Sequence, residues 1–574
     1  MRWKILPPAP SEHLARCAGI PPLLAQLLYN RGIVDPSDAE MFLAADKRLE
    51  NDSALLPEMG KAVAAVMRAV LGGRTIAVFG DFDVDGVTAT TLLVQGLQRI
   101  GARVIPYIPH RVQEGHGLNM PALQKLHQQG ARLVITVDCG ITANAEALQA
   151  REMGLDLIIT DHHEVTGPIP TALAVVNPKR GDSTYPFREL AGVGVAFNLL
   201  QALFRATGRD GQADEFLDLV ALGTVADMVP LLAENRYLVR RGLEVLNATS
   251  RLGLRELIRC AGLEMGRIDA ESISFMLAPR LNAAGRLDHA SVSYDLLNAD
   301  SPEQARQGAE LLETRNVERQ RLTSHLMSLA EAKLSVSCPC PVPVSGHRSR
   351  IPDTVLEDTP LLMVAHEEFR AGVNGLVAGK LTDKYYRPAL ILEIRENESR
   401  GSARSIPEFN IVAALSECRD ILSHFGGHAQ AAGFTVPNEN VESLRQRLLE
   451  IAGGQLADVE LQPSINIDAE VKLADLGGET LALITRLEPF GKANPAPTFL
   501  SRGVKVVDFR RVGSDGEHLK LRLNDAGVVW DAIGFDINHG GDTLSCIDIV
   551  YNLKLNTWNG RESLELEIRD FRPT

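Results

Sequence analysis

The spacing of hydrophobic residues changes along the first third of the chain. In residues 1–72 apolar positions recur at helical spacing, for example in 21–31 and 37–43. From about residue 74 to 178, short apolar runs alternate with longer amphipathic stretches. This alternation predicts β-α-β units, and therefore a mostly parallel sheet with helices on both faces. The expected strands are 75–79, 103–108, 132–137, 155–160 and 172–177, and the expected helices lie near 87–100, 119–129 and 143–153.

The pattern of the remaining chain predicts further units. Residues 189–300 have a mainly helical pattern, and the charged stretch 302–335 predicts one long helix of the kind that joins two domains. A second α/β unit follows, and strand-like alternation near the C-terminus, as in 518–523 and 562–568, indicates a small β-barrel. The expected parts are a helical segment 1–72, a parallel-sheet domain 73–300, a long helix 301–335, a linker or insertion 336–360, a second α/β domain 361–458 and a barrel 459–574.

Length and composition limit the class of protein. A chain of 574 residues predicts three or four domains, and 45% hydrophobic with 5% aromatic residues is typical of a soluble α/β enzyme. We find no apolar run of about 18 residues, so no membrane span is expected. The first residues lack the apolar core of a signal peptide. Seven cysteines in a chain of this length do not form a disulfide framework, which indicates a reducing cytoplasm.

Two features carry less information about function. The segment 336–360 is rich in Pro and Ser, and its Cys338-Pro339-Cys340 lacks a second cysteine pair or a nearby histidine pair, so we interpret it as a linker and not as a metal site. The net charge of −14 argues against broad nonspecific binding to nucleic acid. A local basic groove remains compatible with it, and a carboxylate-rich metal site would itself contribute negative charge.

Acidic residues and histidines follow three of the expected strands. Because ligands collect beyond the carboxyl ends of the strands in an open parallel sheet, these side chains are expected to converge although they are far apart in sequence. Taken alone, the first group would be an ordinary capping turn, the second an acidic loop residue and the third a structural pair of histidines. Their occurrence at three strand ends favours a metal site. The residues are Asp81, Asp83 and Asp85, then Asp138, then Asp161, His162 and His163.

The types of ligand narrow the choice of metal. The run from Asp81 to Gly86 opens like a calcium loop, but the twelfth position is Leu92 where such a loop needs Glu, and the run follows a strand. Carboxylates with imidazole and without thiolate favour manganese or magnesium, and imidazole favours manganese. A carboxylate that bridges two cations would hold them roughly 3.5–4 Å apart, the spacing used in phosphoryl chemistry.

Several motifs resemble those of a known family. GDFDVDG (80–86), TVDCG (136–140), ITDHHE (159–164) and LGTVADMVPL (222–231) resemble the ordered motifs of the DHH phosphoesterases. Longer runs resemble the single-strand-specific exonucleases of that family, and the resemblance covers nearly the whole chain. These runs are LLAQLLYNRGI (23–33), PHRVQEGHGLN (109–119), APRLNAAGRLDHA (278–290), GSARSIPEFN (401–410), FGGHAQAAGF (425–434) and EPFGKANPAP (488–497).

The resemblance implies a fold and a set of metal ligands. It identifies 73–300 as a DHH catalytic domain, 361–458 as a DHH-associated domain that grips substrate, and 459–574 as a nucleic-acid-binding OB fold. Two divalent cations, Mn²⁺ or Mg²⁺, would activate water and clamp the phosphoryl oxygens. Relatives often have histidine where this chain has Phe79, and Asp81 or water would replace that ligand. The implied ligands of one cation are Asp83 and Asp138, together with Asp81. The implied ligands of the other cation are Asp85, Asp138, His162 and Asp227.

The resemblance also implies roles for residues around the cations. Besides the bridging Asp138, Asp161 would orient His162, and His163 would face the phosphate and stabilise charge or protonate the leaving oxygen. Glycines would let backbone amides approach a phosphate or base, although Ala403 stands where relatives often have glycine. The implied substrate-binding residues are His110, Arg111, Arg280, Asn282, Ser402, Arg404, Ser405, Gly426, Gly427 and His428. In the barrel, Arg510, Arg511, His518, Lys520 and Trp530 are candidates for contacting a single strand, and a solvated barrel face is the alternative.

The activity implied is that of a 5′-to-3′ exonuclease specific for single-stranded DNA, which releases 5′-mononucleotides and acts in recombination and repair. Single-stranded DNA is the implied partner, with a single-strand-binding protein and a RecQ-type helicase as protein partners, and a monomer is expected. One rival is a DHH enzyme for short oligoribonucleotides or cyclic dinucleotides, but the extra N- and C-terminal regions favour a longer polymer. The other rival is a binding protein with a decayed site, against which the intact acidic set argues.

Overall fold

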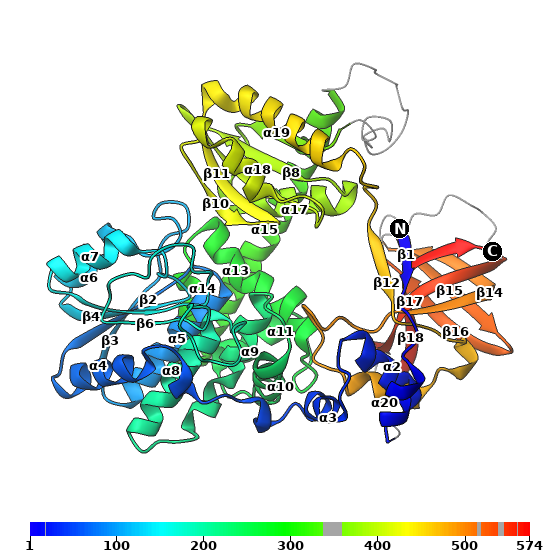
Figure 1. Ribbon diagram of the computed structural model, residues 1–574, viewed down its shortest axis with the longest axis horizontal. Helices are drawn as coiled ribbons and strands as arrows, with labels where there is room; N and C mark the ends of the chain where they lie inside the picture. Colours follow the sequence, from blue (N-terminus) through cyan, green and yellow to red (C-terminus); the bar gives the residue numbers. More distant parts are fainter. Residues whose placement is uncertain (18, 337–358, 514–517, 536, 538–544, 559–560) are drawn as a thin grey trace.

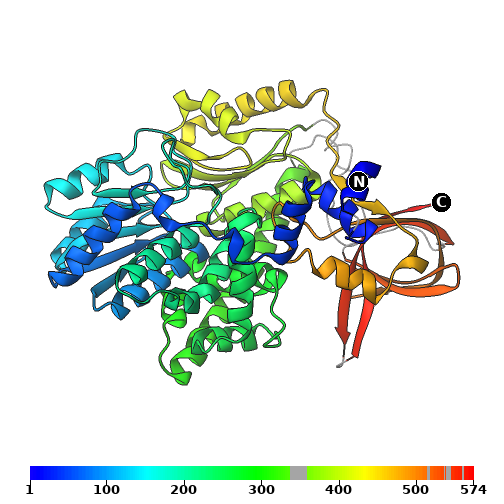
Figure 2. The same cartoon turned by 60° about the horizontal axis from the view of Figure 1, so that its bottom comes forward.

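The computed structural model describes residues 1–574 except 18, 337–358, 514–517, 536, 538–544 and 559–560 (Figure 1). A first α/β domain, coloured blue to cyan, adjoins a group of green helices. The second α/β domain lies above these helices, and the orange-red barrel lies to one side with the N-terminal helices against it (Figures 1 and 2). The expected linker 336–360, with Cys338-Pro339-Cys340, lies almost entirely outside the described residues.

The first α/β domain contains a five-stranded sheet in the order β3-β2-β4-β5-β6, and all of its pairings are parallel, as predicted. Side chains alternate between the faces of a strand, so Ile76 and Val78 pack in one core with α4, α5 and α8, while Ala77 and Phe79 pack in another with α6 and α7. The elements are α4 (Met59–Leu71), β2 (Thr75–Gly80), α5 (Val84–Arg99), β3 (Arg103–Tyr107), α6 (Met120–Gln128), β4 (Ala131–Val137), α7 (Asn144–Glu152), β5 (Asp156–Thr160), β6 (Ala174–Val176) and α8 (Gly192–Ala206).

Helices follow this sheet, and they end in the predicted long helix. The helix α9 packs on α5 and is buried along almost its whole length, which agrees with its uniformly apolar sequence. A π-helical turn, Ile273–Leu277, separates α12 from α13. The helices are α9 (Leu217–Ala226), α10 (Ala233–Asn247), α11 (Leu252–Cys260), α12 (Ala270–Ser272), α13 (Ala278–Leu287), α14 (Ser291–Leu297) and α15 (Pro302–Val336).

The second α/β domain has a five-stranded sheet in the order β10-β11-β9-β8-β7, in which β7 and β8 are parallel and the other pairs are antiparallel. Helices α15 and α17 cover one face, and α18 and α19 cover the other. The edge strand β10 lies on the side that faces the first domain (Figure 1). The elements are β7 (Leu362–His366), α17 (Ala371–Tyr385), β8 (Ala389–Ile394), β9 (Glu398–Arg404), α18 (Ile411–Glu417), β10 (His424–His428), β11 (Ala431–Pro437) and α19 (Val441–Leu456).

The C-terminal region is a closed barrel. Its sheet has the order β13-β14-β15-β16-β18-β17, and a further pairing of β14 with β17 closes it. Each of the five long strands is therefore paired with a neighbouring strand on both sides. The elements are β12 (Ser464–Ile467), β13 (Ala469–Glu470), α20 (Gly478–Thr485), β14 (Phe499–Val512), β15 (His518–Asp525), β16 (Val528–Gly534), β17 (Cys546–Trp558) and β18 (Arg561–Pro573).

The N-terminal segment differs from the helical prediction at its start. Residues 2–5 form a strand, β1 (Arg2–Ile5), which pairs in parallel with β12. A strand of four residues has no pattern that marks it, and its partner strand, Ser464–Ile467, lies far away in the sequence. The helices α1 (Ser11–Arg16), α2 (Pro22–Asn30) and α3 (Pro36–Ala44) follow, and α2 and α3 pack on the barrel core. None of the helices in the described residues has the length and apolarity needed to cross a bilayer.

Candidate metal centre

The carboxyl ends of three neighbouring strands bring the predicted acidic residues together. Gly80 at the end of β2 is paired with Val137 of β4, and Val137 is paired with Thr160 of β5. The residues that follow these strand ends therefore leave the sheet side by side, and turns carry their side chains to one edge. Asp227 reaches the same place as the residue directly after α9.

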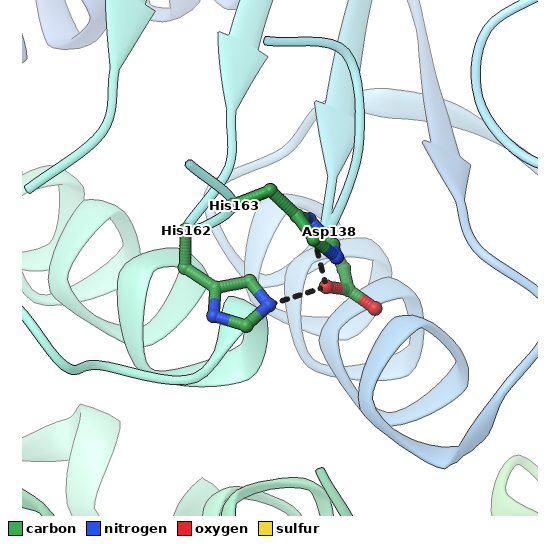
Figure 3. Close-up of side chains that lie close together, drawn as sticks. All are labelled: Asp138, His162 and His163. Carbon is green, nitrogen blue, oxygen red and sulfur yellow. Dashed lines mark ion pairs between the residues drawn. The ribbon is translucent and has the colours of Figure 1, made fainter. Parts of the chain in front are cut away.

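His162 lies at the centre of this cluster. Its Nε2 is 3.1 Å from Oδ1 of Asp138, and Nδ1 of His163 is 4.0 Å from the same oxygen (Figure 3). The His162 Nε2 is also 3.7 Å from Asp227 Oδ2 and 4.0 Å from Asp85 Oδ2. Three sets of side chains have ligand atoms within 4.8 Å of one another: Asp81, Asp83 and Asp138; Asp85, His162 and Asp227; Asp138, His162 and His163. Asp138 belongs to two of these sets.

Close backbone packing positions the carboxylates. Asp83 is the N-cap of α5, where its side chain accepts a hydrogen bond from Gly86 N at 3.1 Å. A Cβ at Gly86 would lie 2.5 Å from Asp81 O, so only glycine permits this turn. The carboxylate of Asp85 accepts hydrogen bonds from the backbone N–H groups of Gly192 and Val193 at the start of α8.

Asp161 has a different partner from the expected one. Its Oδ1 accepts a hydrogen bond from His163 Nδ1 at 2.7 Å, and bonds from the backbone N–H groups of His162 and His163. Its Oδ2 accepts from Ile141 N at 2.8 Å. The side chain therefore orients the ring of His163, whereas the sequence predicted that it orients the ring of His162. The reason is local: Nδ1 of His163 lies against Asp161, whereas Nε2 of His162 lies against Asp138.

The electrostatics of the cluster require positive charge. Burial and mutual repulsion raise the pKa of Asp83 and Asp138, that of Asp85 to about 7 and that of Asp227 to about 9. Burial lowers the pKa of His162 to about 3, so the ring is neutral, as a metal ligand must be. Among the described residues, Asp138 Oδ1 and His162 Nε2 are buried without a hydrogen-bond partner. Crowded carboxylates and neutral imidazole with unpartnered atoms fit divalent cations.

The position of the missing family histidine has a clear structure. Phe79 is fully buried and stacks on Tyr107 at 5.4 Å between ring centroids, and its phenyl ring has no ligand atom for a cation. Next to this position, Oδ1 of Asp81 lies 2.9 Å from Nδ1 of His116. The charge of Asp81 raises the pKa of His116 to about 9. His116 was not predicted as a site residue, although it lies within the family-like run 109–119.

Arginines gather beside the cluster, where the two α/β domains meet. Arg111 lies over the ring of Phe82 at 4.5 Å, and the charges of Asp81 and Asp83 act on it. Burial and the charges of Arg111, Arg319 and Arg404 lower the pKa of Arg286 to about 9. Arg286 also donates a hydrogen bond to Gly372 O of the second domain at 3.1 Å. It was missed, and only its place in the run 278–290 could have indicated it.

Several predicted substrate-binding residues lie on strands β9 and β10 of the second α/β domain. His428 on β10 has its pKa lowered by burial and by the charges of His163 and Lys179, so it faces the metal cluster from the second domain. Gly426 and Gly427 are exposed on the same edge strand. Gly427 has φ 140°, and a Cβ there would lie 2.2 Å from Ala431 O. Ser402 is half-buried on β9, one strand further into the sheet than β11.

Three predicted phosphate contacts have local partners of their own. Nδ1 of His110 accepts hydrogen bonds from the backbone of its own turn, at Val112 and Gln113. Arg280 donates to Glu313 of α15 at 2.5 Å and to Met276 O at 2.7 Å, so it joins helices. The buried Ser405 donates to Phe409 O at 2.7 Å. Asn282 is half-buried on α13.

The barrel corrects one of the five candidates for strand binding. Trp530 is buried in the barrel core and donates its indole N–H to Leu473 O at 3.0 Å, so it offers no surface for stacking. Strand alternation explains this, because Trp530 points inward between outward-facing neighbours. Arg510 and Arg511 are exposed on β14, His518 lies against Phe535 with ring centroids 5.1 Å apart, and Lys520 is 3.4 Å from Glu565.

Family models match three parts of the chain. The N-terminal domain of the DHH family matches residues 75–224, the DHHA1 domain matches 358–454, and the RecJ OB domain matches 467–570. These matches correspond to the sheet domain with the metal cluster, the second α/β domain and the barrel.

Relatives match over nearly the whole chain. The single-stranded-DNA-specific exonuclease RecJ of Bacillus subtilis is 39% identical over 99% of this chain and 70% of its own length. The enzyme of that name from Escherichia coli is 32% identical over 97% of this chain and 96% of its own length. The crystal structure of RecJ from Thermus thermophilus in complex with Mn²⁺ matches this structure with a TM-score of 0.83 and 29% sequence identity, over all of this chain and 79% of that one. The Mg²⁺ complex of the same protein matches with a TM-score of 0.77 and 28% identity, over all of this chain and 78% of that one. The chain therefore belongs to the RecJ family of the DHH phosphoesterases.

Proposed function

We propose that this chain is a 5′-to-3′ exonuclease that degrades single-stranded DNA to 5′-mononucleotides with two divalent cations. One observation carries the proposal: Asp138 lies in a set of closely spaced ligands with Asp81 and Asp83, and its Oδ1 is also 3.1 Å from Nε2 of His162, which belongs to the set with Asp85 and Asp227. This is the position required of a carboxylate shared by two cations. Support for the substrate comes from the relatives, which are named single-stranded-DNA-specific exonucleases.

The ligands divide into two groups around Asp138. Mn²⁺ or Mg²⁺ bound here would supply Lewis-acid activation of water and neutralise charge on the phosphoryl oxygens. The imidazole of His162 favours manganese. The neutral ring of His162 and the unpartnered Oδ1 of Asp138 are ready to bind without losing other contacts. One group is Asp81, Asp83 and Asp138, and the other is Asp85, Asp138, His162 and Asp227.

His163 is the residue that we assign to the leaving group. Its ring lies beside the cluster, 4.0 Å from Asp138 Oδ1, and is less buried than the ring of His162. Asp161 accepts a hydrogen bond from Nδ1, which fixes the ring and directs Nε2 away from Asp161. From this position Nε2 can donate a proton to the oxygen that leaves when the phosphodiester bond breaks.

The arginines beside the cluster are assigned to the 5′ end of the strand. Besides burial, the charges of Arg111 and Arg404 lower the pKa of Arg286, and the charge of Arg111 lowers the pKa of Arg404. A phosphate bound between these arginines would relieve the repulsion. His428 and the glycines of β10 border the same space from the second domain. In the 5′-to-3′ direction proposed here, a strand held there by its 5′ end would present its first phosphodiester bond to the cations.

A single comparison of substrates tests this proposal. The protein is incubated with manganese and one of four substrates: a long 5′-labelled single strand, its duplex, a dinucleotide or a cyclic dinucleotide. Release of labelled mononucleotide from the single strand is expected to be fastest. A preference for dinucleotides would support an oligoribonuclease or cyclic-dinucleotide phosphodiesterase, and inactivity on all four would support a binding protein.

We also propose a setting for this activity. DNA recombination and repair in the cytoplasm is consistent with the substrate named for the relatives and with the free state of the described cysteines. A single-strand-binding protein and a RecQ-type helicase are the protein partners proposed, because each would supply the enzyme with single strands. The chain is proposed to act as a monomer.

A further inference from the structure

The segment between α20 and the barrel strand β14 does more than connect these two elements, because it also contacts the helix α10 and the turn between α9 and α10. In both views this orange segment extends from the barrel to the green helices (Figures 1 and 2). Leu231, four residues after the metal ligand Asp227, donates its backbone N–H to Lys492 O at 2.9 Å. A Cβ at Gly491 would lie 2.7 Å from Cδ1 of Leu231, so the two segments are in close contact. The segment therefore reaches the border of the metal cluster.

Hydrogen bonds fix the conformation of this segment. Asn494 is fully buried, and its Nδ2 donates to Leu487 O and Pro489 O, both at 2.8 Å. Its Oδ1 accepts from Nε of Arg31 at 2.8 Å, and Arg31 also donates to Pro495 O. The backbones of Gly491 and Asn494 bond to each other in both directions. Lys492 thus lies in a tight, internally bonded loop.

A buried arginine ties the same segment to the catalytic domain. Arg236 of α10 is fully buried and donates to Leu487 O and to Phe42 O, both at 2.8 Å. Its guanidinium carbon lies 3.9 Å from the centroid of the Phe42 ring. One side chain therefore holds together the catalytic domain, the N-terminal segment and the segment that carries Lys492, so the position of Lys492 relative to Asp227 is fixed.

The side chain of Lys492 is exposed beside the cluster. Its positive charge offsets part of the rise that burial causes in the pKa of Asp227, and it adds to the lowering that burial causes in the pKa of His428 of the second domain. The ammonium group therefore acts on both sides of the metal site. Lys179 acts on the same two groups, but it is paired with Glu164 at 3.0 Å and with Glu189 at 3.6 Å. Lys492 forms no ion pair with any residue that the structure describes.

We propose that Lys492 binds a backbone phosphate of the DNA on the 3′ side of the bond being cut, where the strand passes from the barrel to the metal cluster. This inference rests on the proposed function. An ammonium group is a compact charge that binds a phosphate without requiring a particular base. The rigid loop fixes the backbone of Lys492 relative to Leu231 and so keeps the ammonium group within reach of a phosphate beside the cluster. The strand would then be held on both sides of the reacting phosphate.

The test compares Lys492→Gln, Lys492→Glu and Lys492→Arg with the wild-type protein and with Lys47→Gln. Lys47 is 85% exposed and pairs with Glu50 in the N-terminal segment, so this control removes the same charge elsewhere. Affinity for a labelled single strand is measured by fluorescence anisotropy over a range of salt concentrations, without divalent cations so that the strand remains intact. The KM and kcat for a long strand and for a 5′-phosphorylated dinucleotide are then measured with manganese.

For Lys492→Gln we expect the slope of log affinity against log salt to become shallower by about 0.7, the value for one phosphate contact on a single strand. The KM for the long strand rises, and the loss is smaller for the dinucleotide. Lys492→Glu weakens binding further, and Lys492→Arg restores the slope. The thermal midpoint stays unchanged, because the bonds that fix the loop come from its backbone and from Asn494.

Two outcomes would contradict the inference in different ways. If the wild-type protein degrades the strand but Lys492→Gln has the slope and KM of Lys47→Gln, Lys492 does not contact the DNA, and the proposed function stands. If the wild-type protein neither binds nor degrades the strand, the proposed function fails and the role of Lys492 fails with it.

Discussion

Asp161→Asn tests which of the two following histidines, His162 or His163, is oriented by Asp161. The substitution keeps the shape of the side chain but removes its charge and replaces one accepting oxygen by an amide that cannot accept a hydrogen bond. In the structure the two carboxylate oxygens accept four hydrogen bonds, one of them from the ring of His163. We expect the ring of His163 to be held less firmly and activity to fall, while manganese still binds.

The size of this effect follows from the four bonds. A hydrogen bond to a charged group contributes about 1.5–3 kcal/mol and a neutral one about 1, and a buried donor left without a partner costs about 1–3 kcal/mol. If the asparagine oxygen keeps the bonds from His162 and His163, the N–H of Ile141 faces an amide and loses its partner. The turn after β5, which contains Asp161, is then destabilised by about 3 kcal/mol. Loss of a residue that orients a site residue typically lowers activity by about 10–100-fold.

The assay is a double-mutant cycle on a single-strand substrate. Turnover is measured for the wild type, Asp161→Asn, His163→Ala and the double variant, and manganese affinity is measured by calorimetry. If Asp161 acts through His163, Asp161→Asn lowers kcat much less when His163 is already absent. Asp156→Asn is the matched control, since Asp156 begins the same strand β5 and its partner Arg74 is half exposed.

Two results would refute this account. An equal loss of kcat with and without His163 would mean that Asp161 acts elsewhere. A large loss of manganese affinity in Asp161→Asn, with a smaller loss of kcat at saturating manganese, would instead support the role expected from the sequence, in which Asp161 orients the ligand His162.

Three further predictions concern the metal cluster and the domain junction. Asp138→Asn is expected to lower turnover about a thousandfold, roughly the upper range for one electrostatic group, while the circular dichroism spectrum stays unchanged. Asparagine is chosen because φ is 61° at this position, a left-handed conformation that asparagine tolerates. Retained turnover would exclude a bridging role for Asp138. Manganese is expected to raise the thermal midpoint and EDTA to reverse this, because cations neutralise the crowded carboxylates; no shift would contradict the assignment of the ligands. Burial raises the pKa of Glu488 to about 7. The contribution of this group to stability is therefore present below about pH 4.5, the usual pKa of a glutamate, and is lost as pH rises through 7. Glu488→Gln should reduce the fall of the thermal midpoint between pH 5 and pH 8, and an unchanged fall would contradict this.

The sequence predicted the sheet domain well, because its signal is local. Each strand of the parallel sheet is a short apolar run, and its helices have a clear apolar face, so the strand ends and the acidic residues after them could be assigned from spacing alone. Convergence of these residues then follows from the geometry of parallel sheets. The strand β1 could not be predicted, because its pairing with β12 depends on residues that lie far away in the sequence.

The partners of individual side chains were harder to predict. Arg280 and Arg286 lie in one family-like run, and nothing in their spacing shows that Arg280 pairs with Glu313 while Arg286 is buried among arginines. Such choices depend on how α13 is rotated against α15 and the second domain. Trp530 was assigned to the surface of the barrel for the same reason: aromatic side chains suit both a core and a stacking surface, and only register decides between them.

The arrangement of charge also resolves the conflict between a net charge of −14 and a DNA substrate. At physiological ionic strength, charges act in solution over about 8 Å, so a phosphate at the site responds to its neighbours and not to the whole surface. Five carboxylates of the cluster contribute to the negative total, yet they are the groups that bound cations would neutralise. The positive groups left around them would then dominate the local field, and affinity for DNA should depend on them and on the cations. These groups are Arg111, Arg286, Arg404 and Lys492.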